Sequence, residues 1–334
     1  MEKHELLGPW IRRFLLEYLV RERNMSPNTQ HSYRDALRIL LPFLRARIGK
    51  ELDRLRVEDL SADAVRSFLK HIEEQRKVSI QTRNQRLAAI HSLARFIAEL
   101  NPQHVAWYGG IRTVPFKRAS RGLVPYLEKA EVEAILDVPD CSTSSGHRNY
   151  VLLLFLYNSG TRASEATGLC VADVDLGLSP QGTASVRIQG KGRKVRRCPL
   201  WKKTAEELAR LIAGRPEKDK VFLNRYGEPL TRFGIYAVVR ECVAQAGKRL
   251  PSLLSKRVSP HTLRHTTATH LLRAGVDINT IRSWLGHVSL DTTQVYAEVD
   301  LEMKSRALQK CDPGDRKSTS VADLPGLMAF LKKL

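Results

Sequence analysis

Apolar side chains recur at helical spacing through the N-terminal third of the chain. The stripe across residues 9–22 is that of an amphipathic helix. Ser26-Pro27 supplies an N-cap followed by a proline at the first helical position, which predicts a second helix. A third is predicted after Ser61 and a fourth over residues 80–100. Four helices with short connections predict a small helical bundle.

Helical periodicity lapses between about Asn101 and Gly122. Prolines and glycines interrupt this stretch, and its last residues are basic. We therefore expect an interdomain linker here. The expected division is a helical domain (1–108), a basic linker (109–123), a second domain (124–310), and a C-terminal tether and helix (311–334).

The second half of the chain opens with a predicted helix over residues 129–136 and a strongly apolar one over residues 150–158. Because the latter is hydrophobic on all sides, we expect it to lie buried at the centre of its domain. Gly160 fits its C-cap. Arg162 then falls in a turn with Glu165 one helical turn further, an arrangement that would hold a guanidinium rigidly.

Residues 171–200 change to the alternating pattern of strands. The Gly-Lys-Gly sequence centred on Lys191 predicts the turn of a two-stranded hairpin, with Lys191 at its tip. Helices are predicted again over about residues 202–213 and 231–246. The predicted fold class is mainly α, with an N-terminal helical bundle and an α+β second domain that contains a small β-hairpin or sheet.

The stretch from Ser259 to Glu298 concentrates chemically active side chains. His261 and Arg264 open an apolar helix, and His287 and Tyr296 follow after a glycine turn and a second short helix. Phosphate chemistry needs this mixture. Cations bind the phosphate oxygens, and other side chains transfer protons or attack the phosphorus.

The C-terminus carries a short apolar helix on a polar tether. Residues 311–320 are polar, and apolar side chains recur over residues 324–331. Such a helix has little to bury against locally. It could dock in its own molecule or, equally well, in a neighbouring one.

Length and charge narrow the class of protein. A chain of 334 residues is long enough to form two domains, each with its own hydrophobic core. Its content of 43% hydrophobic and 27% charged residues is ordinary for a folded soluble protein, but a net charge of +20 is not. The excess is +8 in residues 1–117 and +12 in the remainder, so both halves are expected to meet a polyanion. Nucleic acid is favoured over membrane headgroups or plain solubility.

Cysteine usage and hydropathy predict a compartment. The five cysteines show no CxxC spacing, and their odd number cannot form a complete disulfide set, which indicates a reducing cytosol. The most apolar run, residues 150–157, is too short to span a bilayer, and the N-terminus lacks the apolar core of a signal peptide. We therefore expect a cytoplasmic protein without a membrane partner.

Each singled-out residue also has a plain structural interpretation. A tyrosine at helical spacing is usually core or surface, a helix histidine is usually structural, and Arg162 with Glu165 could be a simple ion pair. His261 and His265 share a helix face as zinc ligands do, but Thr262 stands where the HExxH motif needs a glutamate. We therefore expect no metal.

Taken together and in order, the motifs are specific. The chain resembles the tyrosine recombinase family, which includes the Xer proteins and phage lambda integrase, through SGTRASE, GKGRK, HTLRH, LGH and a tyrosine nine residues after the last histidine. SPNTQHSYRDAL and QTRNQRLAAIHSLARF resemble that family's core-binding helical bundle. AEV after Tyr296, where THV is usual, and a longer tail depart from the Xer pattern. A mobile-element integrase therefore fits at least as well as a resolvase of chromosome dimers.

Phosphodiester chemistry gives these residues their expected roles. Arg162 and Arg264 would bind the nonbridging oxygens, where negative charge builds during attack. Tyr296 would attack, with His261 accepting its proton and a 3′-phosphotyrosine as the product.

Further roles follow from the resemblance. It implies that Lys191 protonates the departing 5′-oxygen, with Lys194 as the competing candidate. His287 would bind a nonbridging oxygen, and Glu165 would orient Arg162 or His261. Because the covalent step preserves the energy of the phosphodiester, no ATP, metal or other cofactor is expected.

The expected partner is double-stranded DNA with specific core sites, held in a C-shaped clamp. The resemblance implies a homo-tetramer on paired sites, alone or with a partner recombinase, which exchanges strands through a Holliday junction. The terminal helix would then dock on the neighbouring protomer. Five basic residues outside the second domain are the candidate DNA contacts: Arg83, Arg86, Lys117, Arg118 and Arg121.

Two other functions stay open on the sequence. One is a type IB topoisomerase-like relaxase, which would cut and reseal one strand as a monomer. The other is a noncatalytic DNA-binding accessory subunit with the same fold.

Overall fold

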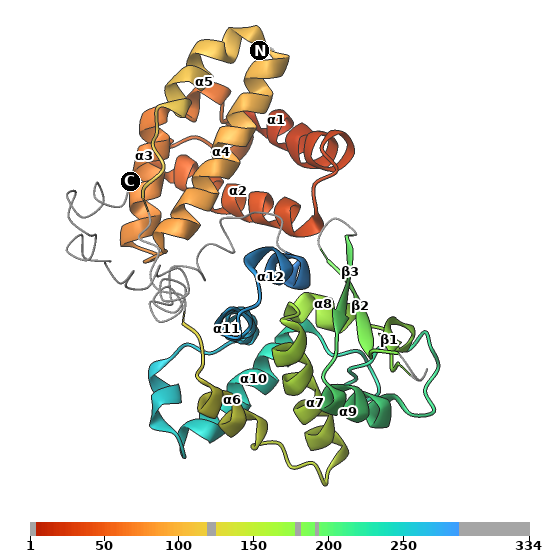
Figure 1. Cartoon of the computed structure of the whole chain (residues 1–334). Coiled ribbons are helices and arrows are strands. Elements are labelled where there is room, and N and C mark those ends of the chain that lie inside the picture. Colours follow the sequence, from red (N-terminus) through yellow and green to blue (C-terminus); the bar gives the residue numbers. More distant parts are fainter. Residues whose placement is uncertain (1–4, 119–124, 178–181, 191–193, 287–334) are drawn as a thin grey trace, which may run out of the picture. The chain divides into compact units, whose positions relative to one another are not determined.

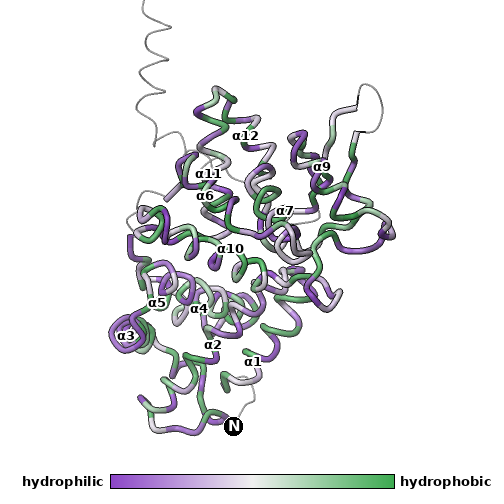
Figure 2. Tube along the Cα trace, turned by 90° about the horizontal axis from the view of Figure 1, so that it is seen from below, coloured by the Kyte–Doolittle hydropathy of each residue, from purple (hydrophilic) through white to green (hydrophobic). Residues whose placement is uncertain are grey.

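The computed structural model describes residues 5–118, 125–177, 182–190 and 194–286. The chain divides into two compact units, Met1–Arg121 and Gly122–Leu334, and each has its own hydrophobic core. Helices dominate both units (Figure 1). Both hydrophilic and hydrophobic residues recur along these helices, as expected where one helix face packs inward (Figure 2). No helix among the described residues is long and apolar enough to cross a membrane.

The first unit is a helical bundle, as predicted. Serine side chains cap three of its helices, since Ser26, Ser61 and Ser79 each accept a hydrogen bond from the amide three residues on. The predicted first helix begins slightly earlier and continues as a π-helix. The helices of this unit are α1 (Leu7–Arg13), the π-helix η1 (Phe14–Glu22), α2 (Pro27–Ile48), α3 (Ala62–Glu74), α4 (Ile80–Leu100) and α5 (Val105–Arg112).

Helix α5 corrects the expected start of the linker. Periodicity was expected to end at Asn101, yet residues 105–112 are helical and residues 109–112 are the last part of α5. The reason is tertiary, because Ile111 and Val114 are completely buried in the core of the first unit. Two glycines weaken the local helix signal, and packing outweighs them.

The second unit is built around α7 (Ser144–Ser159). This helix starts one and a half turns before the predicted boundary, where Thr143 caps the amide of Gly146. Residues 151–156 are all buried, which confirms the expected central position. Helices α9 and α11 pack against it (Figure 1). The other helices of this unit are α6 (Lys129–Leu136), α8 (Ala163–Gly168), α9 (Lys202–Ile212), α10 (Arg232–Gly247), α11 (Pro260–Arg273) and α12 (Ile278–Leu285).

The expected two-stranded hairpin is present as part of a small antiparallel sheet. Its strands are β1 (Val174–Asp175), β2 (Ser185–Gln189) and β3 (Val195–Pro199), in the order β1-β2-β3. Gln189 pairs with Val195, so β2 and β3 form the predicted hairpin, and β1 adds a third strand at its edge. Lys191, expected at the tip, lies outside the described residues.

Candidate active site

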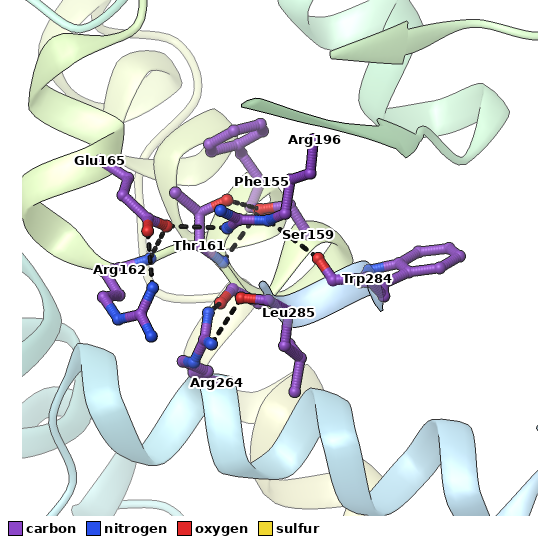
Figure 3. A network of polar contacts seen from close by, with 10 residues as sticks. Phe155, Ser159, Thr161, Arg162, Glu165, Arg196, Arg264, Trp284 and Leu285 are labelled. Carbon is purple, nitrogen blue, oxygen red and sulfur yellow. Dashed lines mark hydrogen bonds and ion pairs between the residues drawn. The ribbon is translucent and has the colours of Figure 1, made fainter. Parts of the chain in front are cut away.

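Arg162 stands at the junction between two helices, as predicted. Gly160 ends α7 in the left-handed conformation, with φ at 59°, and Arg162 then caps α8 in extended conformation. Its backbone N–H donates to Glu165 Oε2 at 3.1 Å, and its Nη1 donates to Glu165 Oε1 at 2.7 Å (Figure 3). The Arg162 side chain is 38% exposed while that of Glu165 is 5% exposed. A buried carboxylate therefore holds an accessible guanidinium.

Arg264 lies deeper, on α11, and is 1% exposed. Its Nη1 donates to the carbonyl of Gly160 and its Nη2 to the carbonyl of Leu285, both at 2.6 Å. The side chain thus joins the C-terminal ends of α7 and α12 (Figure 3). Guanidinium has five N–H groups, so such a residue can bind backbone carbonyls and a phosphate oxygen together.

His261 lies in the first turn of α11, which Ser259 caps. Partial burial, together with the charges of Arg264 and Arg162, lowers its pKa below the usual 6.5. Its ring lies 4.3 Å from that of His265, centroid to centroid. A neutral imidazole near two guanidiniums can accept a proton at neutral pH, which is what the predicted role requires.

Glu165 has a second cationic partner that the sequence interpretation missed. Arg196 of β3 donates from Nη2 to Glu165 Oε2 at 2.7 Å and from Nε to the carbonyl of Trp284 at 2.9 Å. Burial alone raises the pKa of Glu165, but the hydrogen bond and charge of Arg196, aided by Arg162, outweigh it and lower the pKa. The carboxylate is therefore ionised, and its described hydrogen bonds go to Arg162 and Arg196.

A signal for Arg196 was present in the strand pattern. It stands two residues before the buried Cys198, and side chains two apart share a face of a strand. An arginine on the inward face needs a buried partner. The alternation could therefore have identified it, although not which carboxylate it meets.

Several predicted residues cannot be placed in the site. Lys191, His287 and Tyr296 lie outside the described residues. Lys194, the competing acid, is exposed beside β3, and its carbonyl accepts a hydrogen bond from Gly190 N–H at 2.8 Å that closes the base of the hairpin.

The candidate DNA contacts of the first unit differ in exposure. Arg83 is only 5% exposed and donates to the carbonyl of Pro115 at 2.7 Å, so it acts in the interior of this unit. This placement does not favour its predicted role as a DNA contact. Arg86 is partly buried. Lys117 and Arg118 are exposed, and Lys117 pairs with Glu73 at 2.8 Å, while Arg121 lies outside the described residues.

Within the described ranges, no group of three or more His, Cys, Asp or Glu side chains could hold a metal ion. The arginine-rich chemistry of the site is that of anion binding.

A profile of the phage integrase family matches residues 125–303. The chain belongs to this family. A second profile, the N-terminal SAM-like domain of phage integrases, matches residues 11–99. The resemblance to tyrosine recombinases is thereby confirmed across both units, and so is the predicted fold class. The chain is a DNA strand-transfer enzyme.

Similar proteins match most or all of the length of this recombinase. A Sinorhizobium fredii protein, y4rC, provisionally named an integrase/recombinase, is 40% identical over 100% of both chains. The tyrosine recombinase XerC of Pelotomaculum thermopropionicum is 31% identical over 89% of this chain and 96% of that protein.

Solved structures share the fold. The XerH site-specific recombinase bound to difH DNA has a TM-score of 0.67 at 22% identity and covers 88% of this chain and 83% of its own. The integrase of transposon Tn1549 in complex with transposon right end DNA has a TM-score of 0.65 at 18% identity and covers 89% and 98%, respectively.

Proposed function

We propose that this tyrosine recombinase moves or resolves a mobile element by cleaving and rejoining duplex DNA at specific core sites through a 3′-phosphotyrosine at Tyr296. The observation that carries the proposal is the accessible guanidinium of Arg162, which the buried carboxylate of Glu165 holds in place. Near it are the neutral imidazole of His261 and the guanidinium of Arg264, which binds the Gly160 carbonyl. Such donors are fixed before substrate arrives, which is where electrostatic catalysis gains most.

In the cleavage step, the Tyr296 oxygen attacks the phosphorus and the bond from phosphorus to the 5′-oxygen breaks. Arg162 and Arg264 stabilise the charge on the nonbridging oxygens, aided by His287. His261 takes the phenolic proton, and its lowered pKa supports this role because the ring is neutral at pH 7. Lys191 gives a proton to the departing 5′-oxygen.

The reverse step rejoins DNA. A 5′-hydroxyl from a second duplex attacks the phosphotyrosine, the bond from phosphorus to Tyr296 breaks, and the tyrosine recovers its proton. The phosphodiester is exchanged without net hydrolysis, so neither ATP nor another energy source is needed. Two such exchanges through a Holliday junction, in a tetramer on paired sites, complete recombination.

Integration or transposition fits this chain at least as well as resolution of chromosome dimers. Its full-length relative of Sinorhizobium fredii carries the integrase/recombinase name, and the tail beyond Tyr296 departs from the Xer pattern. The overall charge of +20 supports tight, salt-sensitive DNA binding.

The test uses nicked duplexes with randomised core sequence, in which cleavage releases a short strand and traps the adduct. We expect a covalent protein–DNA band on a denaturing gel, and sequencing of the trapped DNA identifies the site. Tyr296→Phe should bind the selected duplex but form no band. An adduct that persists in Tyr296→Phe would overturn the assignment. Relaxation of a plasmid that lacks the selected site would favour a topoisomerase instead.

A further inference from the structure

Arg196 occupies a position where three parts of the second unit meet. It projects from β3, binds Glu165 at the start of α8, and binds the carbonyl of Trp284 in the last turn of α12 (Figure 3). Its side chain is only 9% exposed. A guanidinium suits this position because its planar fork directs Nε and Nη2 in fixed directions, which a lysine ammonium cannot reproduce.

Two glycines lie close to the Arg196 side chain. A Cβ added to Gly190 would lie 3.4 Å from Arg196 Nη1, and one added to Gly286 would lie 3.1 Å from the same atom. Gly190 immediately precedes Lys191, and Gly286 immediately precedes His287. The Arg196 side chain therefore lies beside the two glycines that directly precede these proposed catalytic residues in the sequence.

The contact with α12 is also favourable electrostatically. Trp284 and Leu285 present their carbonyls at the C-terminal end of this helix, where the helix dipole is negative. Arg196 binds the first carbonyl and Arg264 binds the second. The two cations thus hold the same helix end from the side of the sheet and from the side of α11.

We propose that Arg196 is a positioning residue for strand cleavage, which ties the base of the hairpin, the Glu165–Arg162 pair and the end of α12 into one arrangement. It touches no reacting atom. Among the described residues, removing it leaves Glu165 paired with Arg162 alone and releases the Trp284 carbonyl, so Gly190 and Gly286 lose a shared neighbour. Displacement of catalytic groups by about 1 Å can cost about 10²-fold in rate.

This inference rests on the proposed function and is tested with the full-length protein and the duplex selected by trapping. Arg196→Gln removes the charge, while Arg196→Lys keeps it and loses the fork. For both we expect a fall of about 10²-fold in the single-turnover rate of adduct formation at saturating DNA, with the dissociation constant for the duplex unchanged within about threefold. Arg196→Lys tests the geometry without creating an unbalanced charge.

The neighbouring Arg197 supplies the matched control. It lies on the same strand, its side chain is 73% exposed, and its ion-pair distance to Asp175 is 3.8 Å. Arg197→Gln makes the same chemical change and should leave the rate of adduct formation unchanged. Circular dichroism melting of each variant reports whether the fold is retained.

A double-mutant cycle with Glu165→Gln separates positioning from a general loss of stability. If Arg196 acts through Glu165, the double variant should cleave no more slowly than the slower single variant. Strictly additive losses, or a normal rate in Arg196→Gln, would overturn the inference while the proposed function stands. Failure of the unmutated chain to form an adduct would instead remove the proposed function, and this inference with it.

Discussion

Arg264 donates a hydrogen bond to the carbonyl of Gly160 at 2.6 Å, across 104 residues of sequence. Gly160 lies two residues before Arg162, so the buried arginine fixes the backbone from which the exposed one projects. Its other bond, to Leu285, fixes the end of α12. Gly160 therefore has two roles. It ends α7 in the left-handed conformation, and its lack of a side chain leaves room for Leu285.

Gly160→Ala is expected to destabilise the second unit. The residue has a φ of +59°, and an added Cβ would lie 2.4 Å from Leu285 Cδ2. Left-handed strain and overpacking together should cost roughly 2 to 4 kcal/mol. Thermal unfolding followed by tryptophan fluorescence measures the loss. Gly168→Ala is the control, since nothing lies within 4 Å of its added Cβ, and an equal effect there would contradict the explanation.

Substitution of the two arginines should separate catalysis from stability. Arg162→Ala and Arg264→Ala should each slow adduct formation by about 10²- to 10³-fold, because each removes a donor to the developing charge. Only Arg264→Ala should also lower the melting temperature, because it removes the hydrogen-bond donor of two backbone carbonyls. Each buried carbonyl left without a donor costs about 1–3 kcal/mol of stability. Equal melting temperatures for the two variants would contradict the bracing role of Arg264.

The helices were predictable because their signals are local. Serines at the starts of α2 and α3, and apolar side chains at helical spacing in α2, α3 and α4, identified these helices without reference to the rest of the chain. The turn that presents Arg162 was predictable for the same reason, since Gly160 and Glu165 lie within one turn of it. The chemical class followed from the order of motifs, and the family match confirms it.

Other features depend on residues far apart in sequence. Arg264 was predicted to bind phosphate, but its two backbone partners become neighbours only in the folded unit. Helix α5 was missed because its stability comes from Ile111 and Val114 packing into a remote core, not from its own sequence. Arg83 was predicted to be a DNA contact because arginine is usually exposed. In the folded unit it is buried and donates a hydrogen bond to the carbonyl of Pro115, 32 residues away.

The stability of the second unit should decline in mild acid through His265. Burial, with the nearby His261 and Arg264, lowers its pKa from 6.5 to about 4. Between pH 4 and pH 6.5 the unfolded chain therefore binds more protons than the folded one. The contribution of His265 to the free energy of unfolding is complete above pH 6.5 and is lost as the pH falls toward 4. It amounts to at most about 3 kcal/mol, because solvent screens this partly exposed imidazole. His265→Gln should flatten the dependence of melting temperature on pH over this range. The same change at His31, an exposed histidine of α2, should not, and an unaltered slope in His265→Gln would contradict the assignment.

Removal of residues 324–334 should impair assembly more than recognition. These residues lie outside the described part of the chain, but their sequence predicts an apolar helix with little to bury against locally. If that helix docks on a neighbouring protomer, the truncated protein should bind a single core site with normal affinity and lose cooperativity on paired sites. Sedimentation velocity of complexes with one-site and two-site duplexes distinguishes the two effects. A truncated protein that still forms the full-size complex on paired sites would show that the helix docks within its own chain, and weaker binding to the single site would indicate a direct contribution to the DNA interface.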